Sequence, residues 1–188
     1  MKITIHLNAR LQPMHRHDIE DLLEEFLPQA GIKAKVVGGG TALEENGEIA
    51  SCDIDLNIPD SSDETIGKII SFLEGVLAPI GSYIIVYSRF LKKEVKRVPF
   101  GIWEGLGLYL NGSDLDIEVY QNCDVNHVYK ELERLLEEDK KGMIASYWEG
   151  GETALYLYGK SFDEMYAGIK SFIDSYPLCQ KSRVVKIA

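Results

Sequence analysis

The chain repeats part of its own sequence at a separation of 100 residues. Residues 61–88 and 161–188 align without a gap, and seven of the 28 aligned positions are identical. Two unrelated segments of average composition would share about two. The identical pairs are Ser61/Ser161, Asp63/Asp163, Glu64/Glu164, Ile69/Ile169, Ser71/Ser171, Phe72/Phe172 and Ser82/Ser182. We therefore predict that one structural unit was duplicated to give this chain.

Weaker similarities extend the repeat towards the start of each half. Residues 38–43 (Gly-Gly-Gly-Thr-Ala-Leu) resemble residues 150–155 (Gly-Gly-Glu-Thr-Ala-Leu), and Leu7-Asn8 resembles Leu110-Asn111. Similarity that keeps its order along a whole half is typical of duplication.

Apolar periodicity predicts the same order of elements in both halves. Alternating residues indicate strands, apolar residues three or four apart indicate amphipathic helices, and a Ser-x-x-Glu capping box indicates a helix start. In the first half we expect a strand at 2–8, a helix containing Ile19, Leu22, Leu23 and Phe26, strands at 33–37 and 48–58 joined by a glycine-rich loop, a helix opened by residues 61–64, and a strand at 83–88. In the second half we expect a strand at 105–111, a helix containing Val128, Leu132, Leu135 and Leu136, strands at 143–148 and 153–158, a helix opened by residues 161–164, and a strand at 183–187.

A β-α-β-β-α-β order is typical of the ferredoxin-like fold, a four-stranded antiparallel sheet with two helices on one face. The predicted fold class is therefore α+β, with two such units in tandem. We expect unit borders at residues 1–90 and 104–188, with the basic segment 91–103 as a linker or an extended hairpin.

The charge and the cysteines restrict the partners and the compartment. Thirty acidic against twenty basic residues give a net charge of −10, which disfavours a nucleic-acid partner. The sequence shows no apolar run long enough for a signal peptide or a membrane span, so we expect no membrane partner. Cys52, Cys123 and Cys179 are far apart and odd in number, which indicates reduced thiols in the cytoplasm. None of these features indicates an oligomeric state or a required cofactor.

Strand alternation should place His6, Asp53 and Asp55 together on the sheet face opposite the helices. Two carboxylates and an imidazole on neighbouring strands form one candidate metal site, with magnesium as the candidate ion. The alternative interpretation is the solvated face of a half-exposed sheet.

Two glycines and two aspartates form a motif. Val37-Gly38-Gly39, followed after thirteen residues by Asp53-Ile54-Asp55-Leu56, resembles the signature of polymerase-β-type nucleotidyltransferases. The resemblance implies that Gly38 and Gly39 bind nucleotide phosphate and that Asp53 and Asp55 hold magnesium. The family has a helix between the turn and the aspartate strand, whereas this chain predicts a hairpin.

The second half carries aromatic residues where the first carries acids. Tyr109, Tyr156 and Tyr158, with Trp148 nearby, are candidates for an interaction surface or for the joint between the halves. Two helices are rich in acids, which would steer a basic partner towards them. These acids are Glu20, Asp21, Glu24 and Glu25 in the first half and Glu131, Glu133, Glu137, Glu138 and Asp139 in the second.

Three functions remain open at this point. The first is a non-enzymatic protein that binds a basic partner; in size and charge the chain resembles the immunity proteins of bacterial toxin systems. The second is a magnesium-dependent nucleotidyl- or phosphoryl-transfer enzyme that uses Asp53 and Asp55. The third is a small-molecule sensor, because tandem ferredoxin-like units resemble amino-acid-binding (ACT-type) regulatory domains in topology.

Overall fold

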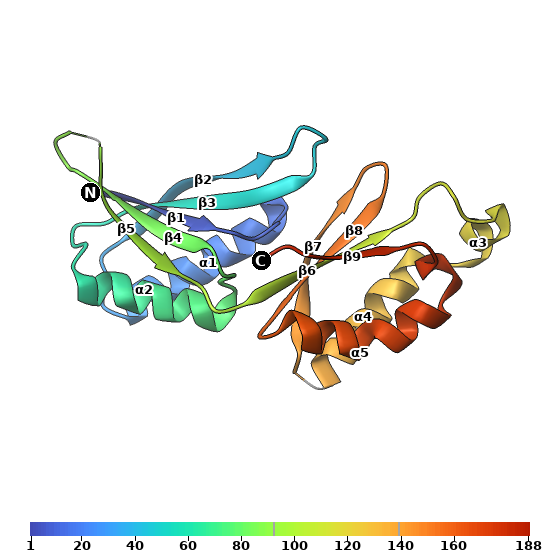
Figure 1. Cartoon of the computed structure of the whole chain (residues 1–188). Helices are drawn as coiled ribbons and strands as arrows, with labels where there is room; N and C mark the ends of the chain where they lie inside the picture. Colours follow the sequence, from blue (N-terminus) through green and yellow to red (C-terminus); the bar gives the residue numbers. More distant parts are fainter. Residues whose placement is uncertain (92, 139) are drawn as a thin grey trace. The chain divides into compact units, whose positions relative to one another are not determined.

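The computed structural model describes residues 1–91, 93–138 and 140–188 and divides the chain into two compact units, Met1–Ile102 and Trp103–Ala188 (Figure 1). Unit 1 consists of β1 (Lys2–Leu7), α1 (Pro13–Gln29), β2 (Lys35–Leu43), β3 (Ile49–Asn57), α2 (Asp63–Val76), β4 (Ser82–Tyr87) and β5 (Glu94–Phe100). Unit 2 consists of β6 (Glu104–Leu110), α3 (Ile117–Asn122), α4 (Val125–Glu138), β7 (Gly142–Glu149), β8 (Thr153–Gly159), α5 (Phe162–Ser175), the 3-10 turn η1 (Pro177–Cys179) and β9 (Arg183–Lys186).

The two sheets share one topology. Strands run in the order β2-β3-β1-β4 in unit 1 and β7-β8-β6-β9 in unit 2, and every neighbouring pair is antiparallel. This is the strand order of the ferredoxin-like fold, so the predicted α+β class is confirmed. The registers also correspond, because Ile5 pairs with Ile54 and Ile84 as Leu108 pairs with Leu155 and Val184.

The first sheet has five strands where the sequence predicted four. Residues 94–100, expected as part of a basic linker or an extended hairpin, form β5 and pair with β4. Phe100 is 9% exposed and lies opposite Ser82, and the half-buried Val98 lies opposite Ile84, so both turn towards the covered face of the sheet. The sequence did not predict this strand, because lysine and arginine dominate the segment and only Val98 and Phe100 show an apolar alternation.

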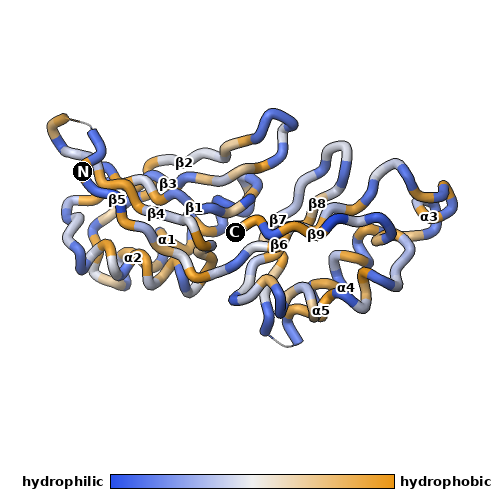
Figure 2. The backbone as a smooth tube through the Cα atoms, viewed as in Figure 1, coloured by the Kyte–Doolittle hydropathy of each residue, from blue (hydrophilic) through white to orange (hydrophobic). Residues whose placement is uncertain are grey.

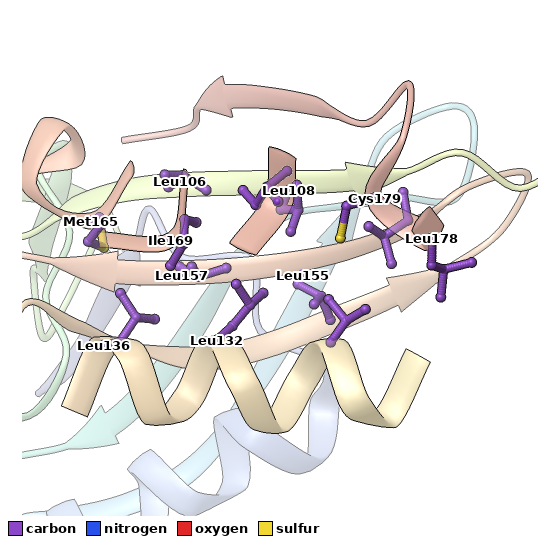
Figure 3. Packing of buried hydrophobic residues seen from close by; sticks show 13 residues of the cluster. Leu106, Leu108, Leu132, Leu136, Leu155, Leu157, Met165, Ile169, Leu178 and Cys179 are labelled. Atoms are coloured by element: carbon purple, nitrogen blue, oxygen red, sulfur yellow. The ribbon is translucent and has the colours of Figure 1, made fainter. Parts of the chain in front are cut away.

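The core of each unit lies between its sheet and its helices. In unit 2, Leu106, Leu108, Leu155 and Leu157 point from β6 and β8 towards α4 and α5 (Figure 3). Leu132 of α4 belongs to the same cluster and is fully buried. Figure 2 shows hydrophobic residues, in orange, in the strands and helices of both units. Among the described residues, no helix has both the length and the apolar character that crossing a bilayer requires.

The glycine-rich segment is a strand and not the predicted loop. Gly38, Gly39 and Gly40 belong to β2 and pair with Asp55, Ile54 and Asp53 of β3. The hairpin turn comes later, at residues 44–48, where Gly47 has a φ of 82°.

One of the aligned similarities does not join equivalent positions. Residues 41–43 end β2, whereas residues 153–155 begin β8, which is the counterpart of β3. The Thr-Ala-Leu match is therefore no evidence of duplication.

The repeated serines also differ in role. Ser161 is the N-cap of α5, and its hydroxyl accepts a hydrogen bond from the Glu164 N–H. In unit 1 the N-cap of α2 is Ser62 and not the aligned Ser61. The Asp60 carboxylate accepts hydrogen bonds from both the backbone N–H and the hydroxyl of Ser62, which fixes the helix start one residue later.

Candidate functional site

The face of the first sheet opposite α1 and α2, called here the open face, holds the predicted polar residues. Ile5 and Ile54 are directly paired, face the helices and are fully buried. Side chains alternate along each strand, so the neighbouring pair, His6 and Asp53, lies on the open face together with Asp55. The structure therefore places all three candidate metal ligands on one face.

His6 and Asp53 are in direct contact. The His6 ring Nδ1 lies 2.7 Å from the Asp53 Oδ1, and the side chains are 22% and 51% exposed. On the other side of β1, the Tyr83 ring stacks on the His6 ring, with 4.4 Å between centroids and an interplanar angle of 16°. An imidazole held between a carboxylate and an aromatic ring has a fixed orientation.

The row of side chains formed by Asp53, His6 and Tyr83 continues onto β5. The Arg97 guanidinium lies 4.3 Å from the centroid of the Tyr83 ring. Arg97 also donates two hydrogen bonds to the Glu94 carboxylate, at 3.0 and 2.8 Å, which raises the pKa of Arg97 and lowers the pKa of Glu94. Asp53, His6, Tyr83 and Arg97 thus form a continuous ladder across β3, β1, β4 and β5.

Asp55 is separately engaged. Its Oδ1 accepts a 2.5 Å hydrogen bond from the Thr4 hydroxyl, and its Oδ2 lies 2.8 Å from the Lys2 Nζ. The hydrogen bond to Asp55 raises the pKa of Lys2. In the part of the chain that the structure describes, no three His, Cys, Asp or Glu side chains come together as a metal site would require. Asp53 and Asp55 share a face, but each has its own partner.

The two predicted phosphate-binding glycines have different surroundings. Gly38 lies opposite Asp55 and has open space where a Cβ would be. A Cβ at Gly39 would lie 2.5 Å from the Asp53 backbone oxygen and 2.7 Å from the Glu20 Oε1. Gly39 is therefore required for the close approach of α1 to the sheet, a structural reason for a glycine at this position.

Two largely buried ion pairs in unit 1 were not expected from the sequence. Arg16, which is 8% exposed, donates to the Glu20 carboxylate at 2.8 Å, and Arg10 pairs with Glu48. Glu20 therefore faces the sheet and does not belong to the exposed acidic surface of α1. The i,i+4 spacing of Arg16 and Glu20 next to buried Ile19 was the available signal.

The predicted aromatic surface of unit 2 is packed. Tyr109, Tyr156 and Tyr158 alternate with the core leucines, so they lie on the sheet face opposite α4 and α5. Their exposed fractions are 5%, 0% and 0%. Tyr109 packs edge-on against Tyr156 at 6.5 Å, and Arg183 lies 4.4 Å from the centroid of the Tyr109 ring.

Glycines opposite the tyrosines leave the space that the tyrosine rings occupy. Gly105 and Gly107 on β6 pair directly with Tyr158 and Tyr156 on β8. A Cβ at Gly105 would lie 2.8 Å from the Tyr158 ring. Of the four aromatic residues predicted as an interaction surface, the three tyrosines are buried and Trp148 is half-buried.

The acidic residues of α4 and α1 differ in their pairing. On α4, Arg134 forms ion pairs with Glu131 at 2.6 Å and Glu138 at 2.8 Å, while Glu137 is exposed. Asp139 lies outside the described residues. On α1, four exposed carboxylates have no ion-pair partner among the described residues. They are Asp18, Asp21, Glu24 and Glu25. Asp18 was not among the acids predicted from the sequence to attract a partner.

Comparison with known proteins gives only distant structural likenesses. No protein-family model and no curated protein sequence matches the chain. A solved structure of an unknown protein from Galdieria sulphuraria is 10% identical, with 98% of this chain and 96% of that chain covered and a TM-score of 0.27. The first two RRM domains of the yeast poly(U)-binding protein Pub1 are 11% identical, with 100% and 99% covered and a TM-score of 0.26.

A third structure is a Fusobacterium nucleatum protein named "Putative monooxygenase". It is 9% identical, with 98% of this chain and 90% of that chain covered and a TM-score of 0.34. Likenesses at these TM-scores carry no argument about function.

Proposed function

We propose that this chain is a non-enzymatic binding protein that attaches to a basic partner through the outer surface of α1. The observation that carries the proposal is the set of unpaired carboxylates on that helix. Asp18, Asp21 and Glu25 follow one another at separations of three and four residues, so they lie along one face of the helix. These carboxylates are free to pair with a partner's cations.

Apolar side chains on the same helix surface support an interface. Met14 and Leu22 are 58% and 42% exposed, and each is four residues from Asp18. Protein interfaces combine an apolar contact area with a polar, charged rim. The buried side of α1, with Ile19 and Leu23, holds the helix against the sheet and presents this surface in a fixed geometry.

Net charge supports the same class of partner. A chain of net charge −10 attracts a positively charged protein over a distance of about a Debye length and accelerates its encounter. The acidic residues on α4 add to this field, although Arg134 partly neutralises Glu131 and Glu138.

The finer form of the proposal is an immunity-type protein that masks a basic toxin. It is supported by the chain's size and acidity alone. We place it in the cytoplasm because Cys52, Cys123 and Cys179 are all unpaired in the structure, as in a reducing compartment.

The test is capture of a basic protein by the immobilised full chain. Protein captured at about 50 mM salt and released at about 500 mM, where the Debye length has become short, is identified by mass spectrometry. The captured protein should have a basic isoelectric point. The variant Asp18→Asn/Asp21→Asn/Glu25→Gln should no longer capture it.

The matched control is Glu133→Gln/Glu137→Gln on α4, which removes exposed charge from another helix. It should retain the captured protein. If the α1 and α4 variants lose it equally, or if binding is unaffected by salt, the proposed α1 interface is wrong.

A further inference from the structure

The end of unit 1 where β2 begins carries a pocket of about 540 Å³. Lys33 and Lys35 line it from the segment that leads into β2, and residues 57–59 line it from the end of β3. Arg89, in the turn after β4, completes it. These three segments of one unit converge on the pocket together with Met1.

The pocket is cationic in an acidic protein. Among the described side chains that line it, those of Lys33, Lys35 and Arg89 are charged, and none is a carboxylate. The Met1 ammonium group, also at the pocket, donates a hydrogen bond to the Ile58 backbone oxygen. Asn57 is exposed at the same place and adds an amide that both donates and accepts hydrogen bonds.

These three cations also differ from the others in the unit. Unit 1 has ten described lysines and arginines, and six of them form ion pairs with carboxylates. The six are Lys2, Arg10, Arg16, Lys68, Lys96 and Arg97. Of the remaining four, Lys33, Lys35 and Arg89 line the pocket, and Lys93 does not. Unpaired positive charge is therefore concentrated at this pocket.

Two carboxylates close to the pocket residues in the sequence are already engaged elsewhere, and Glu24 lines a separate pocket with Lys33 and Lys35. Asp55, two residues before Asn57 on β3, pairs with Lys2 and accepts from Thr4. Asp60, which follows the pocket residues, accepts hydrogen bonds from Ser62 and from the Thr65 hydroxyl, and these lower the pKa of its carboxyl. Neither carboxylate supplies the counter-charge that the pocket needs.

We propose that this pocket binds a small phosphate-bearing anion. Arginine and lysine are the side chains that recognise phosphate, arginine by a planar pair of N–H donors and lysine as a point charge. A volume of about 540 Å³ is in the range of pockets for small molecules and cofactors. Ala34 and Pro59 add apolar walls that an organic group attached to the phosphate would contact.

The experiment is a titration of the full chain with inorganic pyrophosphate, followed by the NMR shifts of backbone amides. Wild-type protein should give saturable shifts confined to residues 33–35, 57–58 and 89. Lys33→Gln/Lys35→Gln and Arg89→Gln should each raise the dissociation constant by about tenfold or more. These side chains are exposed, so the amide spectra of the variants should otherwise match the wild type.

The matched control is Lys93→Gln, which removes the same charge from the same turn but from outside the pocket. Its dissociation constant should stay within about twofold of wild type, because a remote charge is screened by salt. A sodium chloride titration at equal ionic strength should produce no saturable shift. The proposal is overturned if pyrophosphate gives none either, or if all the lysine and arginine variants weaken binding equally.

The result is independent of the proposed basic partner. The α1 variant Asp18→Asn/Asp21→Asn/Glu25→Gln leaves the pocket residues intact and should bind pyrophosphate like the wild type. Loss of pyrophosphate binding in that variant would also contradict the pocket assignment.

Discussion

Asp53 on β3 and His6 on β1 stand directly opposite each other, and their side chains meet at 2.7 Å on the open face of the first sheet. The next residue along β3, Ile54, pairs with Ile5 on the covered face and has no exposed surface. One step along the strand therefore separates a half-exposed polar pair from the core.

This alternation predicts very different costs for two neighbouring substitutions. Asp53→Asn should change the free energy of unfolding by less than about 1 kcal/mol, because the pair is half-exposed. Ile54→Ala should cost about 2–5 kcal/mol, because it leaves a cavity in the core. Urea denaturation of the two variants measures both values. Equal costs would show that Asp53 lies on the covered face.

Gly39 and Gly40 give a second matched pair. Gly39→Ala places a Cβ within 3 Å of the Asp53 backbone oxygen and the Glu20 carboxylate, so it should destabilise the protein by about 1–3 kcal/mol. Gly40→Ala meets nothing within 4 Å and should be close to neutral. Thermal unfolding compares them. A neutral Gly39→Ala variant would contradict the close packing of α1 on β2.

The shifted helix cap predicts that the repeated serines are not equivalent. Ser161→Ala and Ser62→Ala should each cost about 1 kcal/mol, because each removes a cap from a helix start. Ser61→Ala should cost much less, since Ser61 is not the cap. Denaturant midpoints of the three variants check this order. If Ser61→Ala costs more than Ser62→Ala, the helix starts where the sequence repeat had placed it.

Buried thiols should resist alkylation. Burial raises the pKa of Cys52 to about 12 and that of Cys179 to about 11, so both remain protonated at pH 8. Cys123 is only half-buried. Iodoacetamide should therefore modify Cys123 first in the native protein and all three thiols in urea, as mass spectrometry of tryptic peptides will show. Preferential labelling of native Cys52 would contradict its burial.

The same shift makes the protein less stable in alkali. Between the ordinary thiol pKa of 9.0 and the native value of about 12, the unfolded chain has lost the Cys52 proton that the folded chain retains. The unfolded state then binds fewer protons, so the free energy of unfolding falls as the pH rises through this range. A Cys52→Ala variant should show a shallower decline between pH 9 and pH 11 in urea titrations. An identical slope in both proteins would exclude this contribution.

Sequence periodicity was sufficient for most of the architecture. The alternation of Ile3, Ile5 and Leu7 and the helical spacing of Val128, Leu132 and Leu136 predicted elements that the structure contains, because each pattern has one face to bury. Periodicity did not predict β5, because this strand has few apolar residues. It predicted a loop at Gly38–Gly40, because glycines have no side chains that could show a strand alternation.

The candidate sites divide in the same way. Strand parity alone predicted that His6, Asp53 and Asp55 share a face, because side chains on a strand alternate strictly. It did not predict that Lys2 and Thr4 engage Asp55, since that depends on which residues of β1 stand beside it. Strand parity likewise did not predict that the side chains of Tyr156 and Tyr158 are fully buried.

By itself, the sequence determined the two α+β units, the β-α-β-β-α-β order that they share and most residues that face each core, because burial requires a local apolar period. Only the tertiary structure decided which charges are paired. Lys33 and Lys35 on one segment and Arg89 on another meet at one pocket. Arg16 and Glu20 pair beneath the glycines of β2. Such neighbours are brought together by the packing of distant segments. The periodicity of the sequence does not predict which residues of those segments come into contact.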